Sequence, residues 1–400
     1  MNLKKTLLAS ALISVAFGAM QTQAADVPAG VKLADIQELV RGGGAEPATL
    51  DPQKVEGTPG SHRTRELFEG LYNLDGDGNL TPGVAKSYTT NADNTVYTFN
   101  LRNDAKWSNG DSVTAHDFVF GFQRAVDPVT ASAYAWYVEI PSIVNASKII
   151  NGKADVGSLG VKAVDDYTFE VTLERPVPYF VKMTSHQTLF PAPRKTIEKY
   201  GSEWVKPGNM VSNGAYKLDD WIVNEKMVMV RNDNYWNNAK TVIDKVTFLP
   251  LENDSADLKR YEAGEIDITW NLPSDHFKRL KRESPSEVII TPQLGTYYYQ
   301  FTTQVAPYNN PDVRKALSFA INRDVITKYV TGVGEQPAYS FTPSIVNGFD
   351  PETPAYANMT QKEREAEAKK LLQSAGYDKN NPLAFNLLYN TNDGHKRIAI

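Results

Sequence analysis

The chain contains 400 residues, of which 41% are hydrophobic, 10% aromatic and 22% charged. This length exceeds that of one ordinary domain, and the composition supplies a sizeable apolar core and excludes an intrinsically disordered protein. The formal net charge of −5 argues against general binding to nucleic acids or to anionic membrane surfaces.

The N-terminus has the features of a cleavable export signal. Lys4 and Lys5 precede an apolar run over residues 6–20, and Thr22-Gln-Ala24 is a suitable small-residue cleavage site. With about fifteen residues, the run is short for a membrane span. We predict that residues 1–24 are a signal peptide. Because the sequence has no cysteine, we expect a periplasmic protein without disulfide bonds and without a lipid anchor.

Two segments resemble ligand-binding loops but lack the necessary residues. A strand or short helix is expected over Val31–Val40, and the glycine triplet at 42–44 that follows has no Lys-Ser/Thr of a phosphate-binding loop. The segment 75–79 suggests a calcium loop, but the sixth position is Leu80 and the twelfth is Lys86. We therefore interpret the two segments as a flexible turn and a hairpin turn.

The most informative stretch begins with a strand predicted at Tyr97–Leu101, where apolar and polar residues alternate. Asn109-Gly110 predicts a tight turn, because glycine tolerates positive φ. Thr114 and Asp117 then have the spacing of a helix capping box. The helix that follows is expected to bury an apolar face and to stop before Pro128.

Further strands are predicted where apolar and β-branched residues cluster, at Thr168–Leu173, Met227–Val230 and Val242–Leu251. The Asp165-Asp166 pair before the first of them is interpreted as a turn and not as a catalytic dyad, since adjacent residues of an extended chain point to opposite sides. The run Tyr297–Tyr299 is also expected in a strand, with one face in the core and the other free to line a cleft.

The C-terminal part predicts three helices and one strand. The first helix begins at Asn310, with a proline in its first helical position, and the second starts with a capping box at Thr360–Glu363 and ends at Gly376. A strand is expected over Leu383–Tyr389. Residues 393–400 look like the first turns of another helix, so we expect the sequence to end inside an element.

The order of residues in the stretch 97–118 resembles the signature of the peptide/nickel family of extracytoplasmic solute-binding proteins. The matching positions are Leu101-Arg102, Asp104, Trp107, Asn109-Gly110, Thr114 and Asp117-Phe118. Stretches at 213–216, 234–236, 260–269 and 310–324 also resemble the family, so the resemblance covers nearly all of the chain after residue 25.

The resemblance implies an α/β fold, in the form of a two-lobed clamshell with a discontinuous first lobe. Residues 25–68 and 193–294 would form the first lobe, residues 69–192 an inserted small domain, and residues 295–400 the second lobe. Family members usually continue further, so the second lobe is expected to be incomplete and the sequence to be a fragment.

The resemblance also implies a periplasmic receptor that captures short peptides and delivers them to the membrane permease subunits of a peptide ABC importer. Pairing with the ligand backbone would be independent of the ligand sequence, and hydrated pockets would accept different side chains. Closure of the lobes would signal occupancy to the transporter. We expect a monomer, with no nucleic-acid partner and no direct membrane anchor.

Family roles are transferred residue by residue. Glu56-Gly57-Thr58 match the extended segment that pairs with the ligand backbone, Tyr134 matches a hydroxyl donor of the cleft, and His186 matches a histidine at its side. Tyr298 falls in the strand beneath the cleft, and His395 matches a cationic partner of the ligand's C-terminal carboxylate. Two alternatives stay open: Tyr134 and Tyr298 as core aromatics, and His395 as a solvated helix residue.

Three departures from the family pattern bear on the ligand. Thr331 replaces a lysine that is often found near the ligand's carboxylate end, and Gly295 replaces a cysteine of some members. The segments 293–299 and 332–338 look closer to the murein-tripeptide subgroup than to the general oligopeptide subgroup. The aspartate that pairs with the ligand's α-amino group would lie beyond residue 400.

No pattern in the sequence predicts catalysis or a bound cofactor. The five histidines have no metal-ligand spacing, and no Gly-x-Ser-x-Gly, His-Glu-x-x-His or Walker pattern occurs. We therefore predict a protein that is not an enzyme and binds no metal or cofactor. The alternatives are a binding protein for murein tripeptide or haem in the same family, a periplasmic hydrolase, and a chaperone-like peptide binder.

Overall fold

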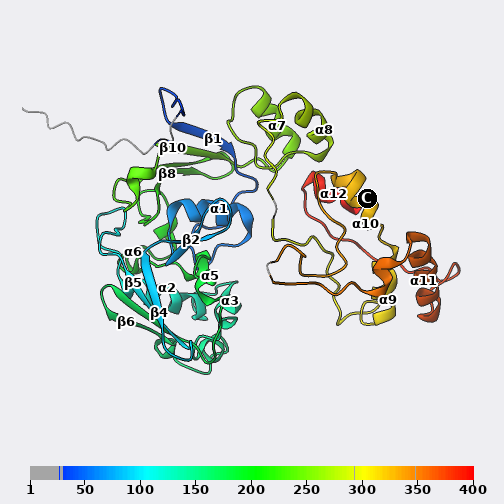
Figure 1. The fold of residues 1–400 in the computed structure, drawn as a ribbon, viewed down its shortest axis with the longest axis horizontal. Coiled ribbons are helices and arrows are strands. Elements are labelled where there is room, and N and C mark those ends of the chain that lie inside the picture. The colour runs from blue at the N-terminus through cyan, green and yellow to red at the C-terminus, as the bar shows by residue number, and fades with distance from the viewer. Residues whose placement is uncertain (1–26, 28–29, 292, 347) are drawn as a thin grey trace, which may run out of the picture. The chain divides into compact units, whose positions relative to one another are not determined.

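The computed structural model describes residues 27, 30–291, 293–346 and 348–400 (Figure 1). The predicted signal peptide, residues 1–24, lies outside these residues. The chain divides into two compact units. We call them unit 1 (residues up to 38, 48–221 and 228–246) and unit 2 (residues 39–47, 222–227 and 247–400). The division into three finer domains remains a prediction.

Unit 1 contains a four-stranded antiparallel sheet of order β4-β5-β7-β6, a β2-β3 hairpin and several helices. The strands are β2 (Tyr72–Leu74), β3 (Leu80–Pro82), β4 (Ala85–Thr90), β5 (Val96–Leu101), β6 (Val161–Asp165) and β7 (Thr168–Thr172). The α-helices are α1 (Gly57–Leu67), α2 (Ala115–Val126), α3 (Ala135–Glu139), α4 (Ala146–Ile150), α5 (Phe180–Met183) and α6 (Arg194–Tyr200). The 3₁₀ turns are η1 (Val156–Ser158), η2 (Gln187–Leu189), η3 (Gly201–Val205) and η4 (Asn238–Lys240).

A second four-stranded sheet has the order β1-β10-β9-β8. Its strands are β1 (Glu38–Gly42), β8 (Tyr216–Ile222), β9 (Lys226–Arg231) and β10 (Lys245–Leu249). The strands predicted at 227–230 and 242–251 are therefore confirmed. The strand or helix expected over 31–40 is wrong before Glu38, because Val31 and Ile36 are exposed and have no buried face to occupy.

The core of unit 1 lies between the β4-β5-β7-β6 sheet and helix α2. Alternate residues of β5 are buried, as the sequence pattern predicts. Phe99 of β5 and Phe169 of β7 have ring centroids 6.2 Å apart. Helix α2 adds Phe118 and Phe122, whose rings lie 5.6 and 5.2 Å from that of Phe169. These aromatic contacts hold α2 on the sheet.

The local signals around this core are also confirmed. Gly110 has φ of 92° and its amide donates to the carbonyl oxygen of Trp107. Thr114 and Asp117 form the capping box of α2, with the Thr114 amide donating to Asp117 Oδ2 at 2.8 Å. The segment 75–79 is the turn of the β2-β3 hairpin.

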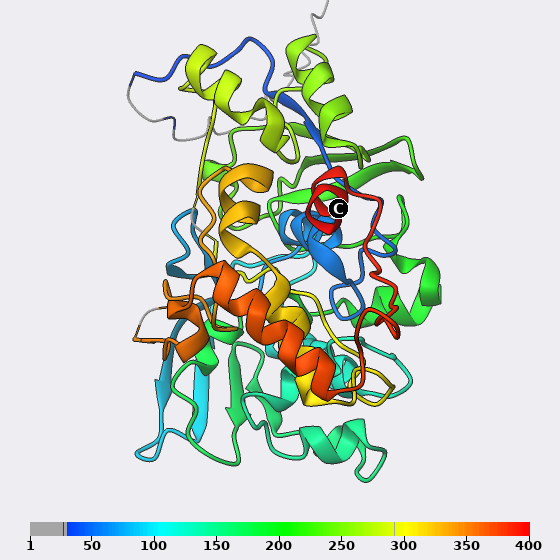
Figure 2. The same cartoon turned by 90° about the vertical axis from the view of Figure 1, so that its right-hand side faces the viewer.

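Unit 2 is mainly helical in the residues that the structure describes. Its helices are α7 (Asp254–Glu262), α8 (Ser274–Glu283), α9 (Pro311–Ala320), α10 (Arg323–Val325), the π-helical η5 (Ile326–Thr331), the 3₁₀ turn η6 (Ala355–Asn358), α11 (Gln361–Ser374) and α12 (Asp393–Ala399). Helices α9 and α11 pack against each other (Figure 2). The predicted caps at Asn310 and Thr360 are both formed, so these two helix predictions are confirmed.

Two strand predictions in unit 2 are wrong. Residues 297–299 and 383–389 adopt no regular strand. A strand exists only where a neighbouring strand supplies hydrogen-bond partners, and an apolar pattern alone does not provide them. The mixture of helices and sheets nevertheless gives the α/β class that the sequence predicted. None of the helices in the described part of the chain is long and apolar enough to cross a membrane.

Candidate functional site

The predicted ligand-binding residues fall into both units, and each group is described within its own unit. Unit 1 holds the segment Glu56–Thr58, Tyr134 and His186, whereas unit 2 holds Tyr298 and His395. The structure brings Tyr134 and His186 together, with ring centroids 5.2 Å apart. Within unit 2, Tyr298 and His395 each contact a different aromatic ring.

The structure corrects the prediction that the segment Glu56–Thr58 is extended throughout. Only Glu56 has extended backbone, with φ of −122° and ψ of 154°, while Gly57 and Thr58 form the first turn of α1. Pro59 favours this turn because its fixed φ suits the start of a helix, where its missing N–H is not needed. Residues 57 and 58 therefore do not present the extended backbone that strand-like pairing requires.

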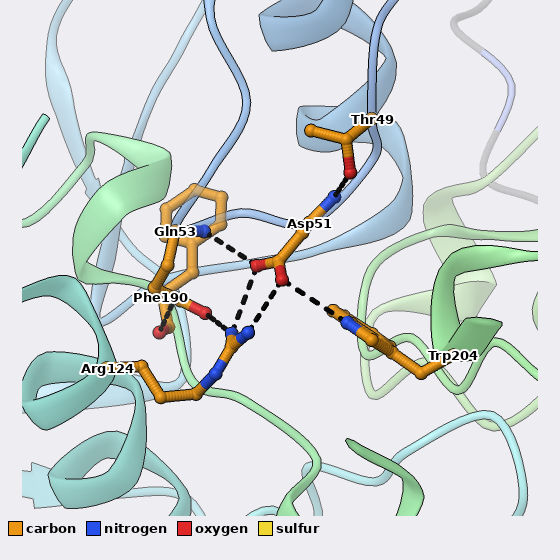
Figure 3. A network of polar contacts seen from close by, with 6 residues as sticks. All are labelled: Thr49, Asp51, Gln53, Arg124, Phe190 and Trp204. Atoms are coloured by element: carbon orange, nitrogen blue, oxygen red, sulfur yellow. Dashed lines mark hydrogen bonds and ion pairs between the residues drawn. The ribbon is translucent and has the colours of Figure 1, made fainter. Parts of the chain in front are cut away.

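A buried polar network holds the loop that leads into this segment (Figure 3). Asp51 is 3% exposed and accepts two hydrogen bonds from Arg124 of α2, at 2.6 Å to Oδ2 and 3.0 Å to Oδ1. The indole Nε1 of Trp204 donates to Asp51 Oδ2 at 3.3 Å. Such a paired and hydrogen-bonded buried charge fixes the loop geometry, because moving either partner leaves the other unpaired.

The same network reaches the segment that carries His186 (Figure 3). Gln53 Nε2 donates to the carbonyl oxygen of Phe190 at 3.0 Å, and Arg124 donates to Gln53 Oε1. Phe190 follows η2, and His186 is the residue immediately before η2. The loop before α1 and the segment 186–190 are thus both fixed to α2.

The imidazole of His186 forms a cluster with three other rings, those of Tyr134, Trp136 and Tyr137, which we call the aromatic cluster. The imidazole stacks on Tyr137, with centroids 4.4 Å apart and planes 27° apart, and Tyr134 lies beside it. Trp136 is 5.7 Å from Tyr134 and 6.1 Å from Tyr137, and about half of its surface is exposed. The cluster therefore presents an aromatic surface to solvent over a partly buried base.

Burial determines the protonation of this base. Burial, together with the smaller effect of the nearby cation of Arg65, lowers the pKa of His186 to about 4. Burial also raises the pKa of Tyr137 to about 12, and its hydroxyl donates to the Met183 carbonyl oxygen at 3.2 Å. The Thr188 amide donates to His186 Nδ1 at 3.3 Å, so the neutral ring carries its proton on Nε2. His186 can therefore donate a hydrogen bond without bearing charge.

In unit 2 the candidate residues lie on coil and at a helix start. Tyr298 is half exposed and its ring lies 5.1 Å from that of Phe341. His395 belongs to the first turn of α12, and its Nδ1 lies 2.7 Å from Asn390 Oδ1. The ring that contacts His395 is that of Tyr297, at 5.3 Å. The sequence prediction names Tyr298 of the tyrosine run, whereas the tyrosine in contact with His395 is Tyr297.

The interactions of Tyr137 and Arg65 with His186 were not predicted from the sequence. Tyr137 lies three residues after Tyr134, a spacing that brings both rings to one side of a helical turn. That spacing was a usable signal. Arg65 offered none, because its effect on His186 depends on the docking of α1 beside η2, which local sequence does not reveal.

The described residues contain open cavities but no candidate metal site. Among them, no group of three or more His, Cys, Asp or Glu side chains is arranged to hold a metal ion. Two open cavities lie within unit 2, with volumes of about 530 and 540 Å³. The first is lined by residues of α7 and α8 and of the segments that follow these helices, and the second by residues around α10, η5 and α11. Neither contains a predicted ligand-binding residue.

Comparisons with known proteins agree with one another. The model of the bacterial extracellular solute-binding proteins, family 5, matches residues 79–400. The periplasmic oligopeptide-binding protein OppA of Salmonella typhimurium is 50% identical over 398 residues, which cover 99% of this chain and 73% of OppA.

Solved structures give the same result. The murein tripeptide binding protein MppA of Escherichia coli has a TM-score of 0.90 at 48% identity, covering 92% of this chain and 72% of MppA. Haemophilus influenzae OppA in complex with RPPGFSPFR has a TM-score of 0.88 at 49% identity, with the same two coverages.

Proposed function

Because the chain belongs to family 5 of the bacterial extracellular solute-binding proteins, we propose that it is a periplasmic receptor that captures short peptides and delivers them to an ABC importer. The observation that carries this proposal is the 50% identity to an oligopeptide-binding protein along nearly the whole chain. Relatives at this similarity are binding proteins, and the two-lobed α/β fold is the one they share.

In this proposal the aromatic cluster is part of the peptide-binding surface of unit 1. A neutral His186 would donate from Nε2 to a peptide carbonyl oxygen without the cost of burying a charge. The Tyr134 hydroxyl would add a second donor. Of the segment 56–58, only Glu56 is retained as a contact to the ligand backbone, since its conformation alone is extended. Tyr298 and His395 are proposed as contacts from unit 2.

Peptide binding is tested by thermal unfolding of the protein with mixed-sequence peptides of two to five residues. A ligand at a hundred times its Kd stabilises the folded state by about 2.7 kcal/mol, which is a readily measured rise in Tm. A folded protein whose Tm is unchanged by every peptide contradicts the proposal. Mass spectrometry of the released ligand separates retention from hydrolysis, because a hydrolase would return cleaved products.

The role of the aromatic cluster is tested by substitution. Tyr134→Phe and His186→Ala are expected to weaken peptide binding, by about tenfold for each lost hydrogen bond. Tyr179→Phe is the matched control, since Tyr179 is half exposed and lies outside the cluster. If all three variants bind peptides as tightly as the wild type, the aromatic cluster is not part of the binding surface. The proposed receptor function would be unaffected by that result.

A second candidate ligand is murein tripeptide. The observation that favours it is the TM-score of 0.90 with the murein tripeptide binding protein of Escherichia coli. Competition decides between the two: a fluorescent oligopeptide that is displaced by murein tripeptide at far lower concentration than by unrelated tripeptides indicates the narrower specificity. Displacement by all tripeptides at similar concentrations indicates a general peptide receptor.

We also propose that residues 1–24 direct export and are then removed, and that the receptor is a monomer. Lys4, Lys5 and the apolar run that follows support the first part. N-terminal sequencing of periplasmic protein is expected to begin at Ala25, and light scattering is expected to give the mass of one chain. An N-terminus at Met1 contradicts the signal peptide, and a doubled mass contradicts the monomer.

A further inference from the structure

The second cavity of unit 2, with a volume of about 540 Å³, contains none of the residues proposed to contact the peptide. It lies among α10, η5 and the start of α11, and we call it the α10–α11 cavity. Three charged residues line it. Lys328 and Asp324 are exposed, whereas Arg364 is only 3% exposed. The wall of this cavity therefore contains a buried cation.

Arg364 has only neutral hydrogen-bond partners. Its Nε and Nη2 donate to Gln361 Oε1 at 3.1 and 3.0 Å, and its Nη1 donates to the carbonyl oxygens of Met359 at 2.7 Å and Tyr356 at 3.4 Å. A guanidinium has five N–H donors, so one N–H on Nη2 is left without an acceptor among the described residues. Buried charges in proteins are normally paired, and within the described chain no acid pairs with this one.

A second guanidinium lies on the other side of a tyrosine that lines the same cavity. The Cζ atoms of Arg323 and Arg364 are 5.2 and 5.6 Å from the ring centroid of Tyr339. The hydrogen bonds of Arg323 also end on neutral oxygens, those of Ser318, Ile321 and Ala338. Two cations thus flank one ring, and neither forms an ion pair with an acid in the part of the chain that the structure describes.

The charges around the cavity do not balance. Lys328, with its Nζ 5.5 Å from the Tyr329 ring centroid, adds a third cation that forms no ion pair with a described residue. Asp324 is the acid among the lining residues, and it forms no ion pair with these cations. Three positive charges therefore face one negative charge, although the whole chain has a net charge of −5.

The start of α11 contributes to the same potential. Thr360 and Gln361 line the cavity, and the first turn of a helix carries a partial positive charge on its free amide groups. The carboxylate of Glu363 offsets part of this charge, because it accepts from the Thr360 amide at 2.7 Å. The helix start alone would not define a site, but it acts in the same direction as the three cations.

We propose that the α10–α11 cavity binds a small oxyanion, a phosphate or carboxylate group, that Arg364 and Lys328 contact directly and that Arg323 attracts over a longer distance. Guanidinium and ammonium groups are the usual partners of both kinds of oxyanion. The volume is in the range of small-molecule sites, and Val325, Pro337 and Met359 give part of the wall an apolar surface. The site therefore also has room for an organic molecule that carries the anionic group.

Isothermal titration calorimetry of the 400-residue chain tests this proposal. Sodium phosphate and sodium acetate are titrated separately at pH 7.5, with sodium chloride keeping the ionic strength constant. We expect saturable binding at one site for at least one of them. Binding of phosphate alone identifies a phosphate site, and binding of acetate alone identifies a carboxylate site. A folded protein that gives no saturable heat with either anion overturns the proposal.

Variants with opposite expected effects locate the anion in the cavity. Lys328→Met should weaken binding of that anion by about tenfold, whereas Asp324→Asn should tighten it, because it removes the lining acid. Both side chains are exposed, so the fold should tolerate these changes. Lys315→Met is the matched control, at an exposed lysine of α9 that does not line the cavity, and should bind like the wild type. If Lys328→Met and Asp324→Asn also bind like the wild type, the anion is bound elsewhere and the proposal is wrong.

Discussion

Arg124 and Asp51 form a two-contact ion pair in the interior of unit 1, although 73 positions separate them in the sequence. The pair joins α2, which packs on the β4-β5-β7-β6 sheet, to the loop that leads into α1. Gln53 extends the same network to the Phe190 carbonyl, next to η2. The residues that flank the proposed binding surface are thus positioned by a contact that lies outside it.

Removal of the Asp51 charge is expected to destabilise unit 1. In Asp51→Asn the Arg124 guanidinium remains buried, with 12% of its side chain exposed, and loses its counter-ion. Breaking one partner of a buried pair costs about 3–5 kcal/mol, so we expect a loss of that order in the free energy of unfolding. Chemical denaturation followed by Trp fluorescence measures it.

The control for this prediction is an exposed pair in the same unit. Arg194 and Glu198 lie 3.9 Å apart with more than half of each side chain exposed, and Glu198→Gln should change the free energy of unfolding by less than about 1 kcal/mol. Equal effects of the two substitutions would mean that the Asp51 pair contributes no more than a solvent-exposed one.

The pH dependence of stability should contain a contribution from His186. Its pKa is about 4 in the folded protein and about 6.5 in the unfolded chain, so the unfolded state binds the proton more tightly. The stabilisation is therefore complete above pH 6.5 and is lost as the pH falls from 6.5 toward 4. The full loss is on the order of 3 kcal/mol.

This contribution is isolated by comparison with His186→Gln, which cannot titrate. As the pH is lowered from 7.5 to 4.5, the free energy of unfolding of the wild type should fall relative to that of the variant. Comparison is essential because Glu69 acts in the opposite direction, stabilising the fold as the pH falls from about 7. A difference that is independent of pH would show that His186 titrates alike in the folded and unfolded chains.

The aromatic core should respond strongly to truncation at Phe169. This side chain is fully buried and contacts the rings of Phe99, Phe118 and Phe122. Phe169→Ala leaves a cavity between the sheet and α2, which costs about 3–5 kcal/mol. Thermal unfolding checks this value, and Phe169→Leu should recover more than half of the loss because it fills most of the space.

Local sequence signals accounted for the elements whose determinants are contiguous. The alternation in β5 and the capping residues Thr114 and Asp117 depend only on neighbours in the chain, and both predictions are confirmed. The strands expected at 297–299 and 383–389 depend on a partner strand, and the described residues provide none. Apolar alternation indicates which face could be buried but does not supply the hydrogen bonds.

In the candidate site, too, features that depend on distant segments could not be predicted from the sequence. Tyr134 and His186 were selected from the family resemblance, and the structure places their rings in contact. Gly57 and Thr58 were assigned an extended backbone, although Pro59 indicated a helix start at that point. Arg65 and Arg124 act through tertiary contacts with distant segments, so no spacing rule could have found them.

The close approach of α2 to the segment 190–191 gives the last prediction. A methyl group on Gly121, in the middle of α2, would collide with the backbone carbonyl of Phe190 and lie 3.3 Å from the Pro191 Cα. Alanine at a helix interior is favoured over glycine by about 1 kcal/mol, and at a free site it would stabilise α2. Here the collision with backbone outweighs that gain, because overpacking costs about 1–3 kcal/mol and backbone cannot rotate away.

We therefore expect Gly121→Ala to lower the Tm. It should also weaken the hydrogen bond from Gln53 to the Phe190 carbonyl, because the new methyl group collides with this same carbonyl. Gly76→Ala is the control, since Gly76 lies in an exposed hairpin turn and a methyl group there meets no atom within 4 Å. A Gly121→Ala protein at least as stable as the wild type would mean that α2 and the segment 190–191 can separate without loss. That result would contradict the interpretation that α2 determines the position of His186.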